Sequence, residues 1–431
     1  MTVANATAVP MTEEKHRAAF FRQSGWLMVA NIAGGLLMWG VHFLAKGISD
    51  EEYGIFGTFL TVVMLLPTMP LQMVLTQQTA KALATHRERE LAGVLRFFWT
   101  GILVLWVIAC AVVLLFQHQI LTGWKMNSPV GLYITLPILL LTLWMPVFWG
   151  ALQGSQNFLW LGWSMMLNGI GRILFSAIMV LALHAAAAGM MTGVLLGLVA
   201  ATIVAAWQTR KLWGGHADPC DWRGLLRQVL PLMLGFCAFQ IMFTADTLYV
   251  KTYFTAEQTG HYVSAGTLSR ALMWLVLPLA AVMFPRIVHS TAKSEKTNLM
   301  GLVLIGTAVL AICGAACMSL LGPILVKIVY KASFVSEATQ ILPWYAFAMV
   351  PLALANVLLN NLMARGAFKV VPAACVVAIA YAFALTRFHT TLVMILQTMG
   401  VANLLLFAAC AWYTWGPSAK PGQASDAAPA A

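Results

Sequence analysis

Three charged side chains lie inside long apolar stretches of this chain, and their chemistry needs an explanation. They are Arg172, Asp246 and Arg270. A charge near the middle of a bilayer costs roughly 2.5 to 3.5 kcal/mol on insertion scales, so each needs a partner or a watery cavity. A guanidinium can bond two phosphate oxygens at once, because its N–H groups form a planar fork. These residue types therefore fit either internal ion pairs or a site for a phosphate-bearing ligand.

Asp246 and Arg270 belong to consecutive apolar stretches and lie at similar depth. At 1.5 Å per helical residue, Asp246 is about 8 Å and Arg270 about 12 Å from the same end. Two interpretations stay open. In one, the two side chains form a structural ion pair. In the other, Arg270 faces a central cavity and binds pyrophosphate when the substrate displaces it from Asp246.

Arg172 lies deeper, about 18 Å into its stretch at the same rise per residue. Asn168 precedes it by one helical turn, and Gly169 and Gly171 beside it allow another helix to approach closely. The group is either a polar clasp between helices or part of a ligand site, and spacing does not decide between them.

Basic residues at the ends of two stretches extend this candidate surface. Lys46 and Lys251 end the first and seventh stretches, and His42 lies one turn before Lys46 on the same helix face. The lysines either reach outward to lipid headgroups or add to the phosphate-binding surface. His42 is either a hydrogen-bonded core residue or a proton carrier.

The composition places these residues in a membrane protein. Hydrophobic residues make up 61% of the 431 residues and charged residues only 9%, which excludes an ordinary soluble domain. Stretches of about 20 apolar residues match the thickness of a bilayer core. Twelve spans are expected, at residues 24–46, 54–77, 97–116, 130–152, 160–183, 189–207, 229–250, 262–285, 299–321, 341–363, 370–388 and 391–415.

Lysine and arginine between the spans predict the orientation, because cytoplasmic loops retain an excess of both. One set of connections holds Lys15, Arg17, Arg22, Lys81, Arg87, Arg89, Arg96, Arg210, Lys211, Arg223, Arg227, Arg286, Lys293, Lys296, Arg365, Lys369 and Lys420. The other holds Lys46, Lys125, Lys251, Lys327, Lys331 and Arg387. We therefore expect both termini in the cytoplasm. The net charge of +11 is mostly this topology signal, and no nucleic-acid partner is expected.

The second half of the chain repeats the first in the same direction. A shift from Glu51 to Glu257 also superposes Gly54 on Gly260 and Phe56 on Tyr262. An even number of spans in each half gives a parallel repeat about an axis along the membrane normal. The sequence predicts an all-α polytopic membrane protein with two six-helix bundles, divided into a cytoplasmic segment 1–23, a bundle 24–207, a cytoplasmic linker 208–228, a bundle 229–415 and a disordered tail 416–431.

Prolines occur in matching stretches of the two halves. Each removes a backbone hydrogen bond and tends to kink its helix, so paired prolines favour hinges or cavity-lining segments. The hinge candidates are Pro67 and Pro70 with Pro278 and Pro285, and Pro137 and Pro146 with Pro343 and Pro351.

Several of these segments resemble one family. The run Ile48-Ser49-Asp50-Glu51-Glu52-Tyr53-Gly54-Ile55-Phe56 is similar to the amino-terminal signature of polysaccharide biosynthesis flippases, the exporters of O-antigen and capsule in bacteria. Further matches lie at 69–71, 246–250, 260–262, 268–270, 283–286, 334–338 and 360–366. The resemblance covers roughly residues 20 to 415. It implies the superfamily of multidrug and toxic-compound exporters and the lipid II flippase, in which two six-helix bundles face each other in a V.

The leading hypothesis is a flippase that moves a polyprenyl-pyrophosphate-linked oligosaccharide across a bacterial inner membrane by alternating access. Its expected partners are this cargo, membrane lipids, a coupling proton or sodium ion, and a glycan polymerase, with the chain acting as a monomer. An exporter of cationic drugs is the alternative, although Asp246 is the one clear acidic residue within a span. A membrane-embedded glycan polymerase or ligase is less favoured, because no metal, nucleotide or nucleophile motif is present. No enzymatic activity, cofactor or metal is expected.

Overall fold

The computed structural model describes residues 13–126, 128–273 and 299–416, and every regular element in these ranges is helical. The first half comprises α1 (Glu13–Gly40), the 3-10 helix η1 (Val41–Gly47), α2 (Asp50–Met64), α3 (Thr68–Ala84), α4 (Glu88–Leu115), α5 (Gln117–Gly123), α6 (Val130–Gly154), α7 (Phe158–Ala177), the π-helix η2 (Ile178–Ala182) and α8 (Ala186–Trp213). The second comprises α9 (Trp222–Tyr253), a helix at 256–273, α11 (Leu299–Leu320), α12 (Gly322–Val329), α13 (Ala332–Ala364), α14 (Val370–Arg387) and α15 (Leu392–Trp415).

Eleven helical segments of the described residues are long and apolar enough to cross a membrane. They correspond to eleven of the twelve predicted spans. The remaining one, 262–285, is described only as far as residue 273 and is helical to that point. Large apolar side chains cover the outside of the molecule, for example Leu105 on α4, Ile305 on α11 and Leu404 on α15, each more than half exposed. Such a surface suits lipid and would be unfavourable in water.

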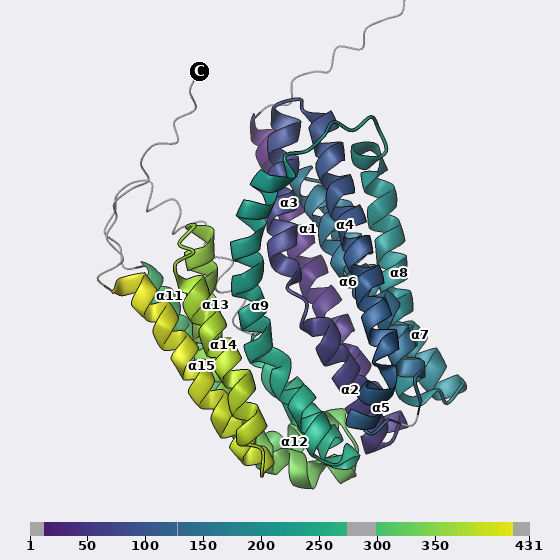
Figure 1. Cartoon of the computed structure of the whole chain (residues 1–431), viewed down its shortest axis with the longest axis vertical. Helices are drawn as coiled ribbons and strands as arrows, with labels where there is room; N and C mark the ends of the chain where they lie inside the picture. The colour runs from purple at the N-terminus through teal and green to yellow at the C-terminus, as the bar shows by residue number, and fades with distance from the viewer. Residues whose placement is uncertain (1–12, 127, 274–298, 417–431) are drawn as a thin grey trace, which may run out of the picture.

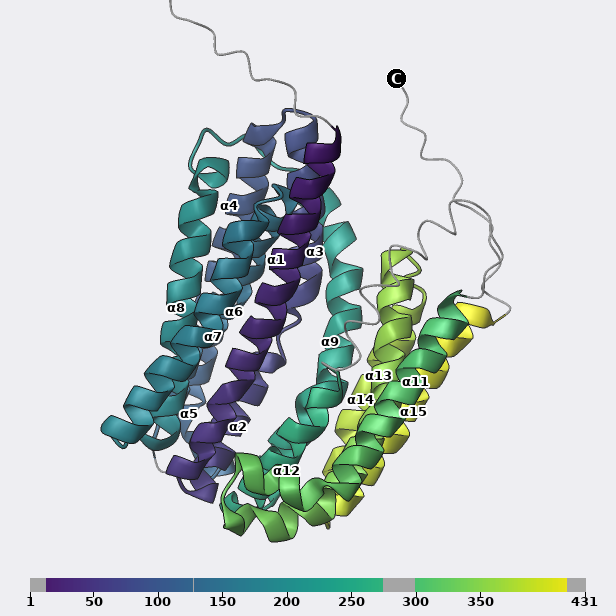
Figure 2. The same ribbon diagram turned by 180° about the vertical axis from the view of Figure 1, so that it is seen from behind.

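The helices form two halves that diverge like the arms of a V (Figure 1). Helices α1 to α8 pack on one another, and α9 packs with α13, α14 and α15 in the second half. Both views show the halves together near α2 and α12, with α11 and α13–α15 diverging from the first half toward the opposite end while α9 stays beside it (Figure 2). Near that end Gln78 on α3 donates to Gln228 on α9 at 3.3 Å. Contacts between the halves join α2 and α3 to α9, and η1 to α12. We call the end near α12 the joined end. The end where α1 begins and α15 finishes is called the terminal end.

The second predicted span is two helices, not one. Residues 65–67 leave helical geometry between α2 and α3, with Pro67 flanking the first turn of α3 and Pro70 inside that turn. Proline disfavours helical geometry in the residue before it, which explains the break. The other described hinge candidates stay inside uninterrupted helices, Pro137 and Pro146 in α6 and Pro343 and Pro351 in α13. Pro278 and Pro285 lie outside the described residues.

The connection expected at residues 322–340 is largely helical. It consists of α12 and the first turns of α13, so the tenth span begins about nine residues earlier than predicted. Pro323 occupies the first turn of α12, where proline is favoured because the amide there has no partner in the helix. This short helix lies across the joined end, and Tyr330 follows it directly.

Candidate functional site

Arg270 and Asp246 form the ion pair that their similar depth suggested. The Arg270 Nη2 donates to Asp246 Oδ1 at 3.0 Å and Oδ2 at 3.2 Å, and to the Thr247 hydroxyl at 2.9 Å. Its Nε donates to the Phe243 carbonyl at 3.1 Å. Both side chains are buried. The hydrogen bonds of Arg270 among the described residues therefore all go to residues of α9.

Two tyrosines complete the neutralisation of Asp246. The hydroxyl of Tyr262 donates to Asp246 Oδ2 at 2.9 Å, and the hydroxyl of Tyr345, on α13, donates to the same oxygen. The guanidinium of Arg270 also lies 5.6 Å from the centre of the Tyr345 ring. This network ties α9, the helix at 256–273 and α13 together, and a fully satisfied buried network of this kind rigidifies its surroundings.

Arg172 has the opposite environment. It is only 7% exposed, and within the part of the chain that the structure describes its Nε and Nη2 find no hydrogen-bond acceptor. A Cβ built on Gly171 would lie 2.8 Å from the Gly197 Cα, so α7 and α8 approach closely beside it, as the glycines suggested. Asn168 bonds elsewhere, donating to the Met38 sulfur at 3.6 Å. Among the described residues, no hydrogen bond joins Asn168 to Arg172.

The end of α1 and η1 pack against α7, the helix that carries Arg172. A Cβ on Gly40 would meet the side chain of Ile173, the residue after Arg172, at 2.7 Å. The ring of Trp39 is 6.2 Å from that of His42, and its indole N–H is buried without an acceptor. Trp39 and Arg172 thus each carry buried N–H groups without an acceptor, and neither belongs to an ion pair among the described residues.

His42 is a hydrogen-bonded core residue in this structure. Its Nδ1 is 2.8 Å from the Tyr53 hydroxyl, which is in turn 2.8 Å from the Tyr330 hydroxyl of the other half. All three side chains are buried. This chain of hydrogen bonds links η1 and α2 of the first half to Tyr330 at the joined end.

The repeated motif itself builds the contact between the halves. A Cβ on Gly54 would lie 2.9 Å from the Gly260 amide nitrogen, and one on Gly260 would lie 2.1 Å from the Asp50 carbonyl oxygen. Only glycine permits this approach, because any side chain would collide with the opposing backbone. The sequence indicated the recurrence of these glycines but not that they meet.

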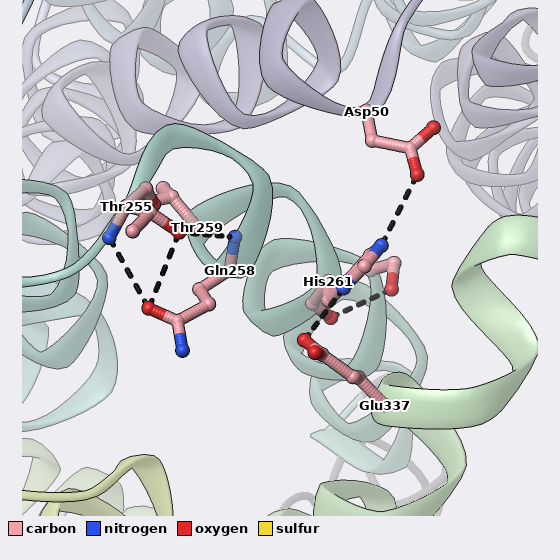
Figure 3. Close-up of polar contacts among 7 residues, drawn as sticks. Asp50, Thr255, Gln258, Thr259, His261 and Glu337 are labelled. Atoms are coloured by element: carbon pink, nitrogen blue, oxygen red, sulfur yellow. Dashed lines mark hydrogen bonds and ion pairs between the residues drawn. The ribbon is translucent and has the colours of Figure 1, made fainter.

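His261 bridges the halves beside these glycines (Figure 3). Its Nε2 is 3.1 Å from Asp50 Oδ2 at the start of α2, and its Nδ1 is 2.8 Å from Glu337 Oε2 on α13. His261 was not among the residues predicted to form the site, and its only signal in the sequence was its place next to Gly260 in the motif. Asp50, Glu257 and His261 also bring potential metal-ligand atoms within 4.8 Å of one another. Both ring nitrogens of His261, however, already contact carboxylates.

The two lysines of the candidate surface differ from each other. Lys46 is exposed, as expected for a side chain that reaches the headgroups. Lys251 is instead 1% exposed, and its Nζ has no hydrogen-bond partner among the described residues. Lys331, on the other hand, fixes the joined end by donating to the Ile48 carbonyl of the first half.

The family described as polysaccharide biosynthesis protein matches residues 20–291, more than half of the chain. The chain belongs to this family. The resemblance found in the sequence is thereby confirmed. No curated protein matches the chain by sequence.

Solved transporters share the fold at low sequence identity. The lipid II flippase MurJ in an inward closed conformation has a TM-score of 0.68 and 15% identity, covering 91% of this chain and 87% of that one. An inward-facing multidrug resistance MATE family transporter of the MOP superfamily has a TM-score of 0.67 and 13% identity, with 90% and 94% covered. An outward-facing member has a TM-score of 0.56 and 14% identity, with 92% and 94% covered. The fold is thus that of this transporter superfamily.

Proposed function

We propose that this protein is a flippase for a polyprenyl-pyrophosphate-linked oligosaccharide. It moves this cargo from the inner to the outer leaflet of a bacterial inner membrane by alternating access, for the synthesis of cell-surface polysaccharide. Membership of the polysaccharide biosynthesis family and the two-halved transporter fold support this assignment.

The charged side chains inside the molecule favour an anionic cargo, because the buried carboxylate has protein partners and a buried guanidinium does not. Asp246 is neutralised by Arg270 and two tyrosine hydroxyls, so it offers no free carboxylate to a cationic drug. Arg172 is buried and has no partner among the described residues. An unpaired buried cation favours a ligand that brings negative charge, and a pyrophosphate does.

The orientation follows from the loops. With both termini in the cytoplasm, the terminal end faces the cytoplasm and the joined end faces outward. The halves then separate on the cytoplasmic side, where lipid-linked precursors are made. The higher similarity to the inward-facing exporter than to the outward-facing one supports the same conformation. Opening of the joined end would release cargo to the outer leaflet.

A deletion strain tests the assignment. Loss of the gene should remove the surface polysaccharide and leave its lipid-linked precursor on the inner leaflet, where it escapes an impermeant glycan-specific lectin added to spheroplasts. The wild-type gene on a plasmid should restore both. Unchanged surface polysaccharide together with increased sensitivity to cationic dyes would favour a drug exporter instead.

A further inference from the structure

His261 is held between carboxylates of both halves at the joined end (Figure 3). Its Nε2 lies 3.1 Å from Asp50 Oδ2 of the first half, and its Nδ1 lies 2.8 Å from Glu337 Oε2 of the second. An ionised carboxylate only accepts hydrogen bonds, whereas a neutral imidazole has one N–H donor and one acceptor nitrogen. A neutral His261 can therefore donate to one of the two carboxylates but not to both.

Closing the joined end thus requires one more proton than keeping it apart. Within the second half, a neutral His261 can donate its Nδ1–H to Glu337, and no further proton is needed. The contact with Asp50 forms only when the halves meet, and it needs a second hydrogen between Nε2 and the carboxylate oxygen. That hydrogen belongs either to an imidazolium or to a protonated Asp50, and both count as one proton bound by the group.

Carboxylates approach His261 from three elements. Glu257 precedes it by one helical turn, and atoms of Glu257, Asp50 and His261 lie within 4.8 Å of one another. Glu52 on α2 is instead turned toward a backbone amide at the start of α8, at 3.0 Å. Without the extra proton, closure would bring Asp50 against Glu257 and Glu337 around a neutral ring, and like charges at such distances repel. A bound proton therefore favours the closed contact.

The other titratable groups beside this ring keep their charge near neutral pH. The ring of Phe334 lies 5.1 Å from that of His261, and it also packs against Tyr53 and Tyr330. The two tyrosine hydroxyls are 2.8 Å apart, and the ammonium of Lys331 donates to a backbone carbonyl of the first half. Imidazole is the side chain that ordinarily changes its charge between about pH 5 and 8, and tyrosine and lysine do not.

We propose that His261 is a proton-binding site that ties closure of the joined end to the pH on the side that this end faces. This site goes beyond the proposed function, because it depends only on the contact between the halves and holds for any cargo. The side chain of Glu337 is 49% exposed and that of His261 is 4% exposed, so a proton can reach the ring from water through Glu337. With the predicted topology this water is outside the cell, and acid there would favour the closed contact.

Electron–electron resonance between two spin labels measures closure in the purified full-length protein without cargo. The labels are attached at Lys46→Cys on η1 and Ser336→Cys on α13, both exposed positions, after replacement of the seven native cysteines. EDTA in the buffer keeps divalent cations from bridging the carboxylates. Between about pH 5.5 and 8.5, the ratio of closed to open distances should fall with rising pH by up to about tenfold per unit, because closure binds one proton.

Substitutions that supply the missing hydrogen distinguish a proton site from a structural histidine. Asp50→Asn carries an amide that can donate to Nε2, so a neutral ring satisfies both contacts; closure should persist and its pH dependence should be lost. Glu337→Gln should act in the same way from the other side. His261→Gln has no titrating ring, so the ratio should no longer change with pH. His118→Gln is the matched control, because His118 is an exposed histidine on α5 at the same end, and its profile should equal that of the wild type.

A distance distribution that stays the same at every pH in the wild type would overturn the proton site. So would a pH dependence that persists in His261→Gln or Asp50→Asn, because the titrating group would then lie elsewhere, for example at His42. Neither result bears on flipping by the wild type in proteoliposomes. Absence of that flipping together with the expected pH profile would reject the flippase and keep the proton site.

Discussion

Replacing Arg270 by alanine should destabilise the second half strongly, because it removes the cation that neutralises Asp246. The guanidinium makes four hydrogen bonds, two of them to this carboxylate. Removing one partner of a buried ion pair typically costs about 3–5 kcal/mol, since the other charge is left uncompensated. Tyr262 and Tyr345 still donate to Asp246 in the variant, so we expect about 3 kcal/mol, at the lower end of that range.

Thermal unfolding of the purified protein and its abundance in membranes measure this loss. Arg270→Ala and Asp246→Asn should each lower both quantities. The double variant should recover most of the loss, because neither charge is then left alone in the interior. The coupling between the two substitutions should be about 2–3 kcal/mol, in the upper part of the range for residues in contact.

Additive losses in the double variant would refute the reasoning, because they would mean that the two side chains do not stabilise each other. Transport by the double variant separates the two roles that the sequence left open. Export restored together with abundance would make the pair structural, as the saturated geometry predicts. A stable double variant without export would place Arg270 in contact with cargo.

The remaining predictions concern the joined end and the orientation. Gly260→Ala should keep the two halves from closing at the joined end, because its Cβ would lie 2.1 Å from a backbone oxygen. Cross-linking of cysteine pairs across this contact should therefore fall. The control Gly101→Ala, whose Cβ would meet nothing within 4 Å, should leave the cross-linking unchanged. His261→Ala should remove the bridge to both carboxylates and increase access of thiol reagents to the joined end, and access equal to wild type would count against a gating role. A cysteine at Glu88 should be shielded from an impermeant thiol reagent in intact cells while one at Gln117 reacts, and the reverse pattern would invert the predicted topology. Residues 24–207 should superpose on 229–415 by rotation about the membrane normal in an experimental structure, and failure of that superposition would remove the parallel repeat.

The fold could be predicted because the hydrocarbon core of a bilayer has a fixed thickness, which sets the length of each spanning helix. Apolar stretches of about 20 residues had to become helices, since a backbone in lipid must satisfy its hydrogen bonds internally. Interruptions were harder to predict. Pro67 lies in the break between α2 and α3, whereas Pro137 and Pro146 lie inside an uninterrupted helix, because neighbouring groups can take up the hydrogen bonds that a proline frees.

The sequence predicted which charged residues the candidate site contains, but not all of the partners that bind them. Depth along the helices brought Asp246 and Arg270 to one layer, and they do form a pair. The same argument could not show that tyrosines from two other segments saturate the carboxylate, because Tyr345 is 99 residues away in sequence. Nor could it show that the indole N–H of Trp39 and the guanidinium of Arg172 are buried without acceptors, which depends on how α1 packs on α7.

The repeat in the sequence indicated which residues form the contact between the halves, but not that they touch. Gly54 and Gly260 occupy equivalent positions in the two repeats. If a two-fold axis relates the repeats, two equivalent residues can meet on that axis. Nothing local in the sequence indicated that they do. His261 was missed for the same reason, since its partners Asp50 and Glu337 come from helices far away along the chain.

Translocation in proteoliposomes of the purified protein tests the central claim most directly. Vesicles are loaded with a fluorescent polyprenyl-pyrophosphate-linked oligosaccharide, and an impermeant glycosidase outside removes only glycan in the outer leaflet. The flippase account predicts that the whole fluorescent pool becomes cleavable with the wild-type protein, while vesicles without protein keep the inner-leaflet share intact. Vesicles that contain folded wild-type protein yet retain that inner share would contradict the account.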